Sequence, residues 1–231
     1  MSRTRESLAQ IAVERVWKLA YGAKYFDEST EVIVFGSMSL GLERPDSDID
    51  VLCVGSHEFK LKTDAVDLVG VPIGQVGRSP WFESELASHI AEYGTWIKGS
   101  SHWACKAKIG QHALDNKRRR ITAFLRSLPG VWLRLDEGFR VKYSVKLRRE
   151  TQRLLLMERG TPVPPTKILD SFWNTVSKSP FDVHDRLRRL TPSHSQFIED
   201  LLDRIDTHFS AVQTAPRHLP SESLRRLASL F

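Results

Sequence analysis

Cysteines and long hydrophobic runs are both scarce in this chain of 231 residues. The two cysteines, Cys53 and Cys105, are too few for a disulfide framework or a cysteine-based zinc site, and free thiols suit a reducing compartment. One apolar stretch, 68–77, is too short to span a bilayer and is interrupted by Gly70 and Pro72. The first ten residues lack the apolar region of a secretory signal peptide. We therefore expect a cytoplasmic protein without a membrane segment.

Several common site motifs are also missing. The sequence has no GxxxxGK[ST] loop, which argues against a P-loop ATPase. Its eight histidines show neither an HExxH pattern nor another paired ligand spacing, so a zinc site is not expected. No RNP, zinc-finger or helix-turn-helix pattern indicates a dedicated reader of nucleic acid.

Charge is distributed unevenly along the chain. The formal net charge is +6, from 34 Lys and Arg against 28 Asp and Glu. Residues 31–111 hold 7 basic and 11 acidic side chains, whereas residues 112–160 hold 13 basic and 5 acidic ones. Since each sign of charge attracts the opposite one, we expect the first segment to hold cations and the second to face anions.

The expected helices and strands divide the chain into two parts. Short apolar runs, typical of buried strands, occupy 31–36, 49–54, 65–69 and, more weakly, 95–98. Helical spacing of apolar residues predicts helices over 5–20, 79–94, 106–128, 138–158, 166–177, 182–190 and 194–211. This order predicts an α/β domain over 1–105, followed by an all-helical domain over 106–231.

Two aspartates lie two residues apart at the start of the second expected strand. Asp48 and Asp50 project from the same face, because successive side chains of a strand alternate between faces. Carboxylates this close repel one another and shift each other's pKa unless a cation lies between them. Hard oxygen ligands suit Mg²⁺, which takes its remaining ligands from water and phosphate oxygens. The spacing therefore indicates a magnesium site.

Two neighbouring features support the same chemistry. Asp67 lies on the third expected strand, which can lie beside the second, and a third carboxylate there completes a two-metal site for phosphoryl transfer. Asp64 is close in sequence, but it precedes Asp67 by three residues and is expected on the opposite face of the strand. Gly36-Ser37 follows the first strand, and we expect this turn to begin a short helix whose N–H groups and hydroxyl bind phosphate.

Together these motifs resemble the polymerase-β-type nucleotidyltransferase superfamily, whose signature is Gly-Ser, about ten residues, Asp-x-Asp and a carboxylate on a later strand. The spacer here is ten residues, 38–47, and the resemblance covers roughly 31–100. It implies an α/β nucleotidyltransferase core with a mixed sheet, followed by an all-α helical domain. Beyond the Gly-Ser pair the chain departs from the pattern, because Leu40 and Leu42 stand where many members carry an arginine and a threonine.

The resemblance also implies the roles of individual residues. Asp48, Asp50 and Asp67 are the expected catalytic residues and the ligands of two Mg²⁺ ions. Gly36 and Ser37 are expected to hold the β- and γ-phosphates of an NTP. Catalysis in such a site is mostly positioning and charge neutralisation.

A basic stripe lies on the expected helix over 138–158. Lys142, Lys146, Arg149 and Arg153 fall at helical spacing on one side, which is either a solvated face or a wall that binds triphosphate or a polyanionic acceptor. Lys142 and Lys146 are the nucleotide-binding candidates by position. The run of four cations over 117–120 is interpreted as a solvated helix surface or, less readily, a nucleic-acid patch.

The resulting hypothesis is an enzyme that transfers a nucleoside monophosphate from an NTP to a hydroxyl of a small molecule, RNA or protein and releases pyrophosphate. The basic helical part favours an anionic or neutral acceptor, such as RNA, over a polycation. Two alternatives stay open. One is an antitoxin or adaptor module that binds rather than catalyses, and the other is a toxin-type transferase that acts on tRNA.

Overall fold

A computed structural model describes residues 4–19, 21–43, 47–175, 183–190 and 195–211. The chain divides into two compact units, Met1–Gly110 and Gln111–Phe231, each described by itself below. No helix among the described residues has the length and apolar character needed to cross a membrane.

The first unit is built on a five-stranded mixed sheet. Its strands are β1 (Glu31–Phe35), β2 (Ile49–Gly55), β3 (Phe59–Lys62), β4 (Val66–Pro72) and β5 (Thr95–Lys98). They lie in the order β3-β4-β2-β1-β5. Strands β2 and β4 are parallel, whereas the other neighbours are antiparallel. The four predicted strands are confirmed, and the edge strand β3 was not among them.

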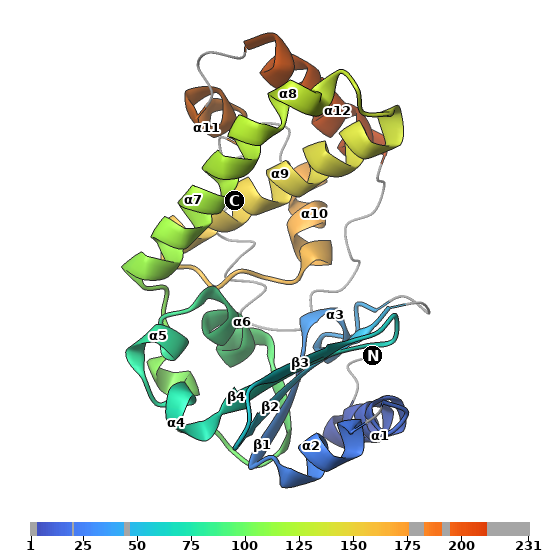
Figure 1. The fold of residues 1–231 in the computed structure, drawn as a ribbon, viewed down its shortest axis with the longest axis vertical. Helices are drawn as coiled ribbons and strands as arrows, with labels where there is room; N and C mark the ends of the chain where they lie inside the picture. Colours follow the sequence, from blue (N-terminus) through green and yellow to red (C-terminus); the bar gives the residue numbers. More distant parts are fainter. Residues whose placement is uncertain (1–3, 20, 44–46, 176–182, 191–194, 212–231) are drawn as a thin grey trace. The chain divides into compact units, whose positions relative to one another are not determined.

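Helices cover both faces of this sheet (Figure 1). Alternate residues of β1 enter two different cores: Val32 and Val34 pack with α1 (Arg5–Val16), while Ile33 and Phe35 pack with α6 (Glu85–Tyr93). Helix α2 (Gly22–Glu28) lies beside α1 on the first face. This two-sided burial explains why the strands read as near-continuous apolar runs.

Short helices connect the strands, and one of them corrects a prediction. They are α3 (Gly36–Ser39), α4 (Ile73–Val76) and α5 (Ser79–Phe82), while the 3₁₀ turn η1 (Ala104–Lys106) follows the last strand. The single helix expected over 79–94 is wrong, because it is divided into α5 and α6. Ser84 causes the division: its extended backbone caps α6, and its hydroxyl accepts a hydrogen bond from the Ala87 N–H.

The second unit is helical, which confirms the predicted fold class of a mixed α/β core followed by helices. Its helices are α7 (Gln111–Ser127), α8 (Pro129–Trp132), α9 (Glu137–Glu158), α10 (Thr166–Thr175), α11 (Val183–Leu190) and α12 (Ser195–Ala211). The long α9 is central, since it contacts α7, α10, α11 and α12. Asp136 caps α9 by accepting a hydrogen bond from the Phe139 N–H. The end of the helix expected over 166–177 lies outside the described residues.

Candidate active site

A row of four register partners crosses the sheet at one end of β2. Phe35 of β1 pairs with Asp50 of β2, Asp50 with Asp67 of β4, and Asp67 with Lys62 of β3. The parallel pairing of β2 and β4 places the two carboxylates opposite one another, as the sequence predicted. Asp48 directly precedes β2 and shares the side-chain parity of Asp50. The structure therefore gathers the three predicted aspartates where β2 and β4 begin.

The turn after β1 lies against Asp50. Gly36 has a φ of +74°, and a Cβ built on it would lie 2.1 Å from Oδ2 of Asp50. Only glycine fits here, because a side chain would be strained by the backbone and would collide with the carboxylate. The chain then turns into the short helix α3, as predicted for the residues after Gly36, and the Ser37 carbonyl accepts a hydrogen bond from the Leu42 N–H.

The clustering of carboxylates perturbs Asp50 most. Its pKa is raised from 3.8 to about 7, mainly by burial and then by the negative charges of Asp48 and Asp67, while the Lys62 ammonium lowers it. Burial and neighbouring negative charges disfavour the ionised carboxylate, whereas a neighbouring positive charge favours it. A perturbed carboxyl group flanked by two others is characteristic of a functional site.

Lys62 is the site residue that sequence reasoning missed. Its Nζ lies 2.7 Å from Oδ2 of Asp67 and 3.6 Å from Oδ2 of Asp48. The hydrogen bond to Asp67 raises the pKa of Lys62 above its usual range. The available signal was the alternation of apolar and basic residues over 59–62, which is typical of a strand with its lysines on one face.

The aspartates suit a hard divalent cation by their chemistry. Asp67 keeps its other carboxylate oxygen, Oδ1, buried without a hydrogen-bond partner among the described residues. A buried oxygen of this kind is costly unless a cation or donor reaches it. In the described part of the chain, however, no three His, Cys, Asp or Glu side chains are arranged to hold a metal ion, and Asp48 and Asp67 both face the Lys62 ammonium.

The neighbouring Asp64 does not take part in this cluster. It lies in the exposed bend between β3 and β4, so the expectation that it occupies the opposite face of a strand is wrong. The reason is that β4 begins at Val66, two residues after Asp64, so Asp64 lies outside the strand. Asp64 is therefore a useful comparison residue for Asp50.

In the second unit, the basic stripe of α9 divides into two pairs. Lys142 and Lys146 are exposed, and their ammonium groups lie 5.9 Å from the Phe139 ring centre and 5.1 Å from that of Phe124. Arg149 and Arg153 instead form ion pairs, Arg149 with Asp170 at 2.6 Å and Arg153 with Glu150 at 3.4 Å. The helical spacing of the stripe is as predicted, but only its first half is exposed.

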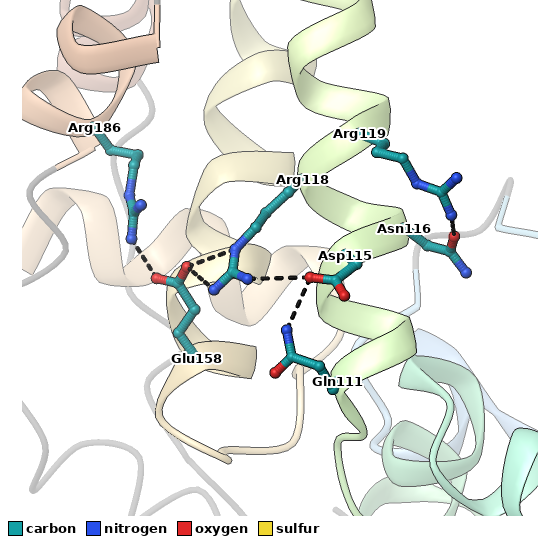
Figure 2. A network of polar contacts seen from close by, with 7 residues as sticks. All are labelled: Gln111, Asp115, Asn116, Arg118, Arg119, Glu158 and Arg186. Atoms are coloured by element: carbon teal, nitrogen blue, oxygen red, sulfur yellow. Dashed lines mark hydrogen bonds and ion pairs between the residues drawn. The ribbon is translucent and has the colours of Figure 1, made fainter.

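The run of cations over 117–120 is mixed: Arg119 and Arg120 are exposed, as the solvated-surface interpretation expects, whereas Lys117 is buried and Arg118 is half-buried. Lys117 is 4% exposed and its Nζ lies 2.8 Å from Oε2 of Glu150, so its interpretation as a solvated side chain is wrong. Arg118 contacts both Glu158 and Asp115, and Arg186 reaches the other oxygen of Glu158 (Figure 2). The acidic partners lie on other turns and helices, so the charge run alone could not reveal them.

Residues 21–97 match the family model of the nucleotidyltransferase domain. The match spans β1 to β4 and most of β5 and contains all three aspartates, while it covers about a third of the chain. The first unit thus carries a nucleotidyltransferase domain, consistent with the polymerase-β-type superfamily. No curated protein matches the chain.

Proposed function

We propose that this protein is a Mg²⁺-dependent enzyme that transfers a nucleoside monophosphate from an NTP to a hydroxyl group and releases pyrophosphate. The observation that carries the proposal is the aspartate cluster at the end of β2 and β4 within a nucleotidyltransferase domain. The adjoining Gly36 turn adds a place where the backbone can approach phosphate.

Each residue of the cluster has a distinct task. Asp48, Asp50 and Asp67 would hold two Mg²⁺ ions, which supply charge neutralisation to the triphosphate when bound. Gly36 and Ser37 hold the β- and γ-phosphates. The acceptor oxygen attacks the α-phosphorus, the bond from that phosphorus to the bridging oxygen breaks, and pyrophosphate leaves. Asp67 helps to take the proton from the acceptor hydroxyl.

The second unit would contribute positive charge to substrate binding. Lys142 and Lys146 are exposed and are proposed to contact phosphates of the nucleotide or of an anionic acceptor. Their charge disfavours a polycationic acceptor. Both cysteines are free thiols, which is compatible with the cytoplasmic location that we propose.

Labelling with α-³²P NTPs tests the proposal. Each of the four nucleotides is incubated with Mg²⁺, cell extract and either the wild-type protein or Asp50→Asn. We expect an acceptor to become labelled by the wild type and not by the variant. Asp64→Asn is the matched control, since Asp64 is exposed and lies outside the cluster. Equal labelling by Asp50→Asn would remove Asp50 from the mechanism.

The ion pairs of Lys62 favour one alternative function, a module that binds partners without catalysis. The Lys62 ammonium beside Asp48 and Asp67 can stabilise these carboxylates without a metal. Calorimetric titration with Mg²⁺ and NTP separates the two functions. An enzyme binds the nucleotide in a metal-dependent manner, whereas a binding module whose aspartates are neutralised by Lys62 does not.

A further inference from the structure

Three aromatic rings and two lysines form a continuous surface on the second unit. Phe139, Lys142, Tyr143 and Lys146 lie on one side of α9, at the spacing of successive helical turns, and Phe124 of α7 lies beside them. We call these five residues the aromatic–lysine face. The ring centres are 6.2 Å apart for Phe139 and Tyr143 and 5.4 Å apart for Phe124 and Tyr143.

This face is open to solvent. Phe139 is 47% exposed, both lysines are exposed, and the other two rings are half-buried. An exposed phenylalanine contributes little to the core, and its ring surface remains available to another planar group. The face is therefore accessible to a ligand, at least within this unit.

The two lysines differ from most cations around them. Among the described residues of this unit, nine Lys and Arg side chains contact an Asp or Glu: Lys117, Arg118, Arg148, Arg149, Arg153, Arg186, Arg188, Arg189 and Arg204. Lys142 and Lys146 lie over aromatic rings instead. A ring does not neutralise an ammonium as a carboxylate does, so these two lysines keep a positive field directed at solvent.

We propose that the aromatic–lysine face binds single-stranded nucleic acid. Lysines pair with the phosphates, and aromatic rings stack with bases, which is the combination that single-strand binding surfaces use. A duplex fits the face less well because its bases are stacked on each other and present only their edges. That the bound strand is also the acceptor rests on the proposed function; the binding itself does not.

Fluorescence anisotropy tests the binding without NTP or Mg²⁺. The probe is a labelled oligonucleotide of about 12 nucleotides, tested as RNA, as DNA and as the matching duplex. We expect either single strand or both to bind more tightly than the duplex. Phe139→Ala should weaken binding about fivefold or more, since one stacked base is lost. Lys142→Gln and Lys146→Gln should each make the dependence of log K on log salt less steep, by about 0.7 in the magnitude of the slope.

Two controls isolate the two contributions. Leu133→Ala removes a side chain of the same unit that is 86% exposed and aliphatic, and it should bind the strand as the wild type does. Polyglutamate is a polyanion without bases, so Phe139→Ala should leave its binding unchanged. Wild-type affinity of Phe139→Ala for the oligonucleotide, equal binding of duplex and single strand, or no binding at low salt would each overturn the proposal.

The same assay separates this inference from the proposed enzyme activity. Asp50→Asn should bind the oligonucleotide normally while it fails to label any acceptor. If the wild type binds single strands but labels no acceptor, the proposed transferase activity is wrong and the proposed binding by the aromatic–lysine face is supported. If the wild type labels an acceptor normally but binds no single strand, the proposed binding by the aromatic–lysine face is wrong and the proposed transferase activity stands.

Discussion

The Lys62 ammonium of the edge strand β3 lies 2.7 Å from Oδ2 of Asp67, its register partner on the neighbouring strand β4. A second carboxylate oxygen, of Asp48, lies 3.6 Å from the same nitrogen. A side-chain cation thus stands among groups that the proposed function assigns to Mg²⁺. A bound metal and the ammonium must therefore compete for these oxygens, because each neutralises the same negative charge.

The first prediction is that Lys62→Met binds Mg²⁺ more tightly than the wild type. Removal of the ammonium leaves the carboxylates without their internal counter-charge, so an ion gains more on entering. We expect an affinity increase of severalfold, measured by calorimetric titration. Lys60→Met is the control, since Lys60 lies on the same strand and is exposed. Weaker metal binding by Lys62→Met would show instead that Lys62 positions Asp67 for the metal.

The second prediction concerns Asp50 and pH. Its pKa is raised from 3.8 to about 7, so the folded protein binds a proton more tightly than the unfolded chain does. Stability from this group is therefore present below pH 3.8 and is lost as the pH rises through about 7. Asp50→Asn resembles the protonated form and should stabilise the metal-free protein near pH 8 by up to about 4 kcal/mol, with a smaller gain near pH 5.

Urea unfolding in EDTA at the two pH values measures this difference. Asp64→Asn is the control variant, because Asp64 is exposed and lies outside the cluster. Added Mg²⁺ should stabilise the wild type more than Asp50→Asn at the higher pH. A variant that is less stable than the wild type near pH 8 would contradict the assigned cost of the Asp50 charge.

The sequence predicted the site residues that are positioned by local spacing, but not the one that is positioned by contacts between distant segments. Asp48, Asp50 and Gly36 are defined by local spacing, and the strand period alone aligns the two aspartates. Lys62 was missed because its role depends on which strand pairs with β4, and strand order is a tertiary property.

The same distinction explains the basic segment. Helical spacing predicted the range of α9 and the end of α7 closely, since each helix satisfies its own backbone hydrogen bonds, but α7 begins at Gln111 and not at residue 106 as expected. The burial of Lys117 depends on Glu150, which is distant in sequence and is brought near by helix packing. A run of like charges therefore looked solvated although one member is inside.

The third prediction is that Gly36→Ala destroys the turn beside Asp50. The added Cβ would lie 2.1 Å from the carboxylate oxygen, and the φ of +74° is unfavourable for alanine. We expect a loss of at least about 1–2 kcal/mol in unfolding free energy and loss of acceptor labelling. Gly74→Ala is the control, because no atom lies within 4 Å of its added Cβ. Full activity of Gly36→Ala would exclude the close contact.

The fourth prediction is that Lys117→Ala unfolds the second unit more readily. Lys117 is 4% exposed, and its removal leaves the largely buried Glu150 without its closest cation. Breaking one side of a buried pair costs about 3–5 kcal/mol, whereas replacing both partners by apolar residues is often neutral. The double variant Lys117→Met/Glu150→Leu should therefore recover much of the stability. Arg119→Ala, an exposed neighbour, is the control for urea unfolding. A loss no larger for Lys117→Ala than for Arg119→Ala would show that the pair is not structural.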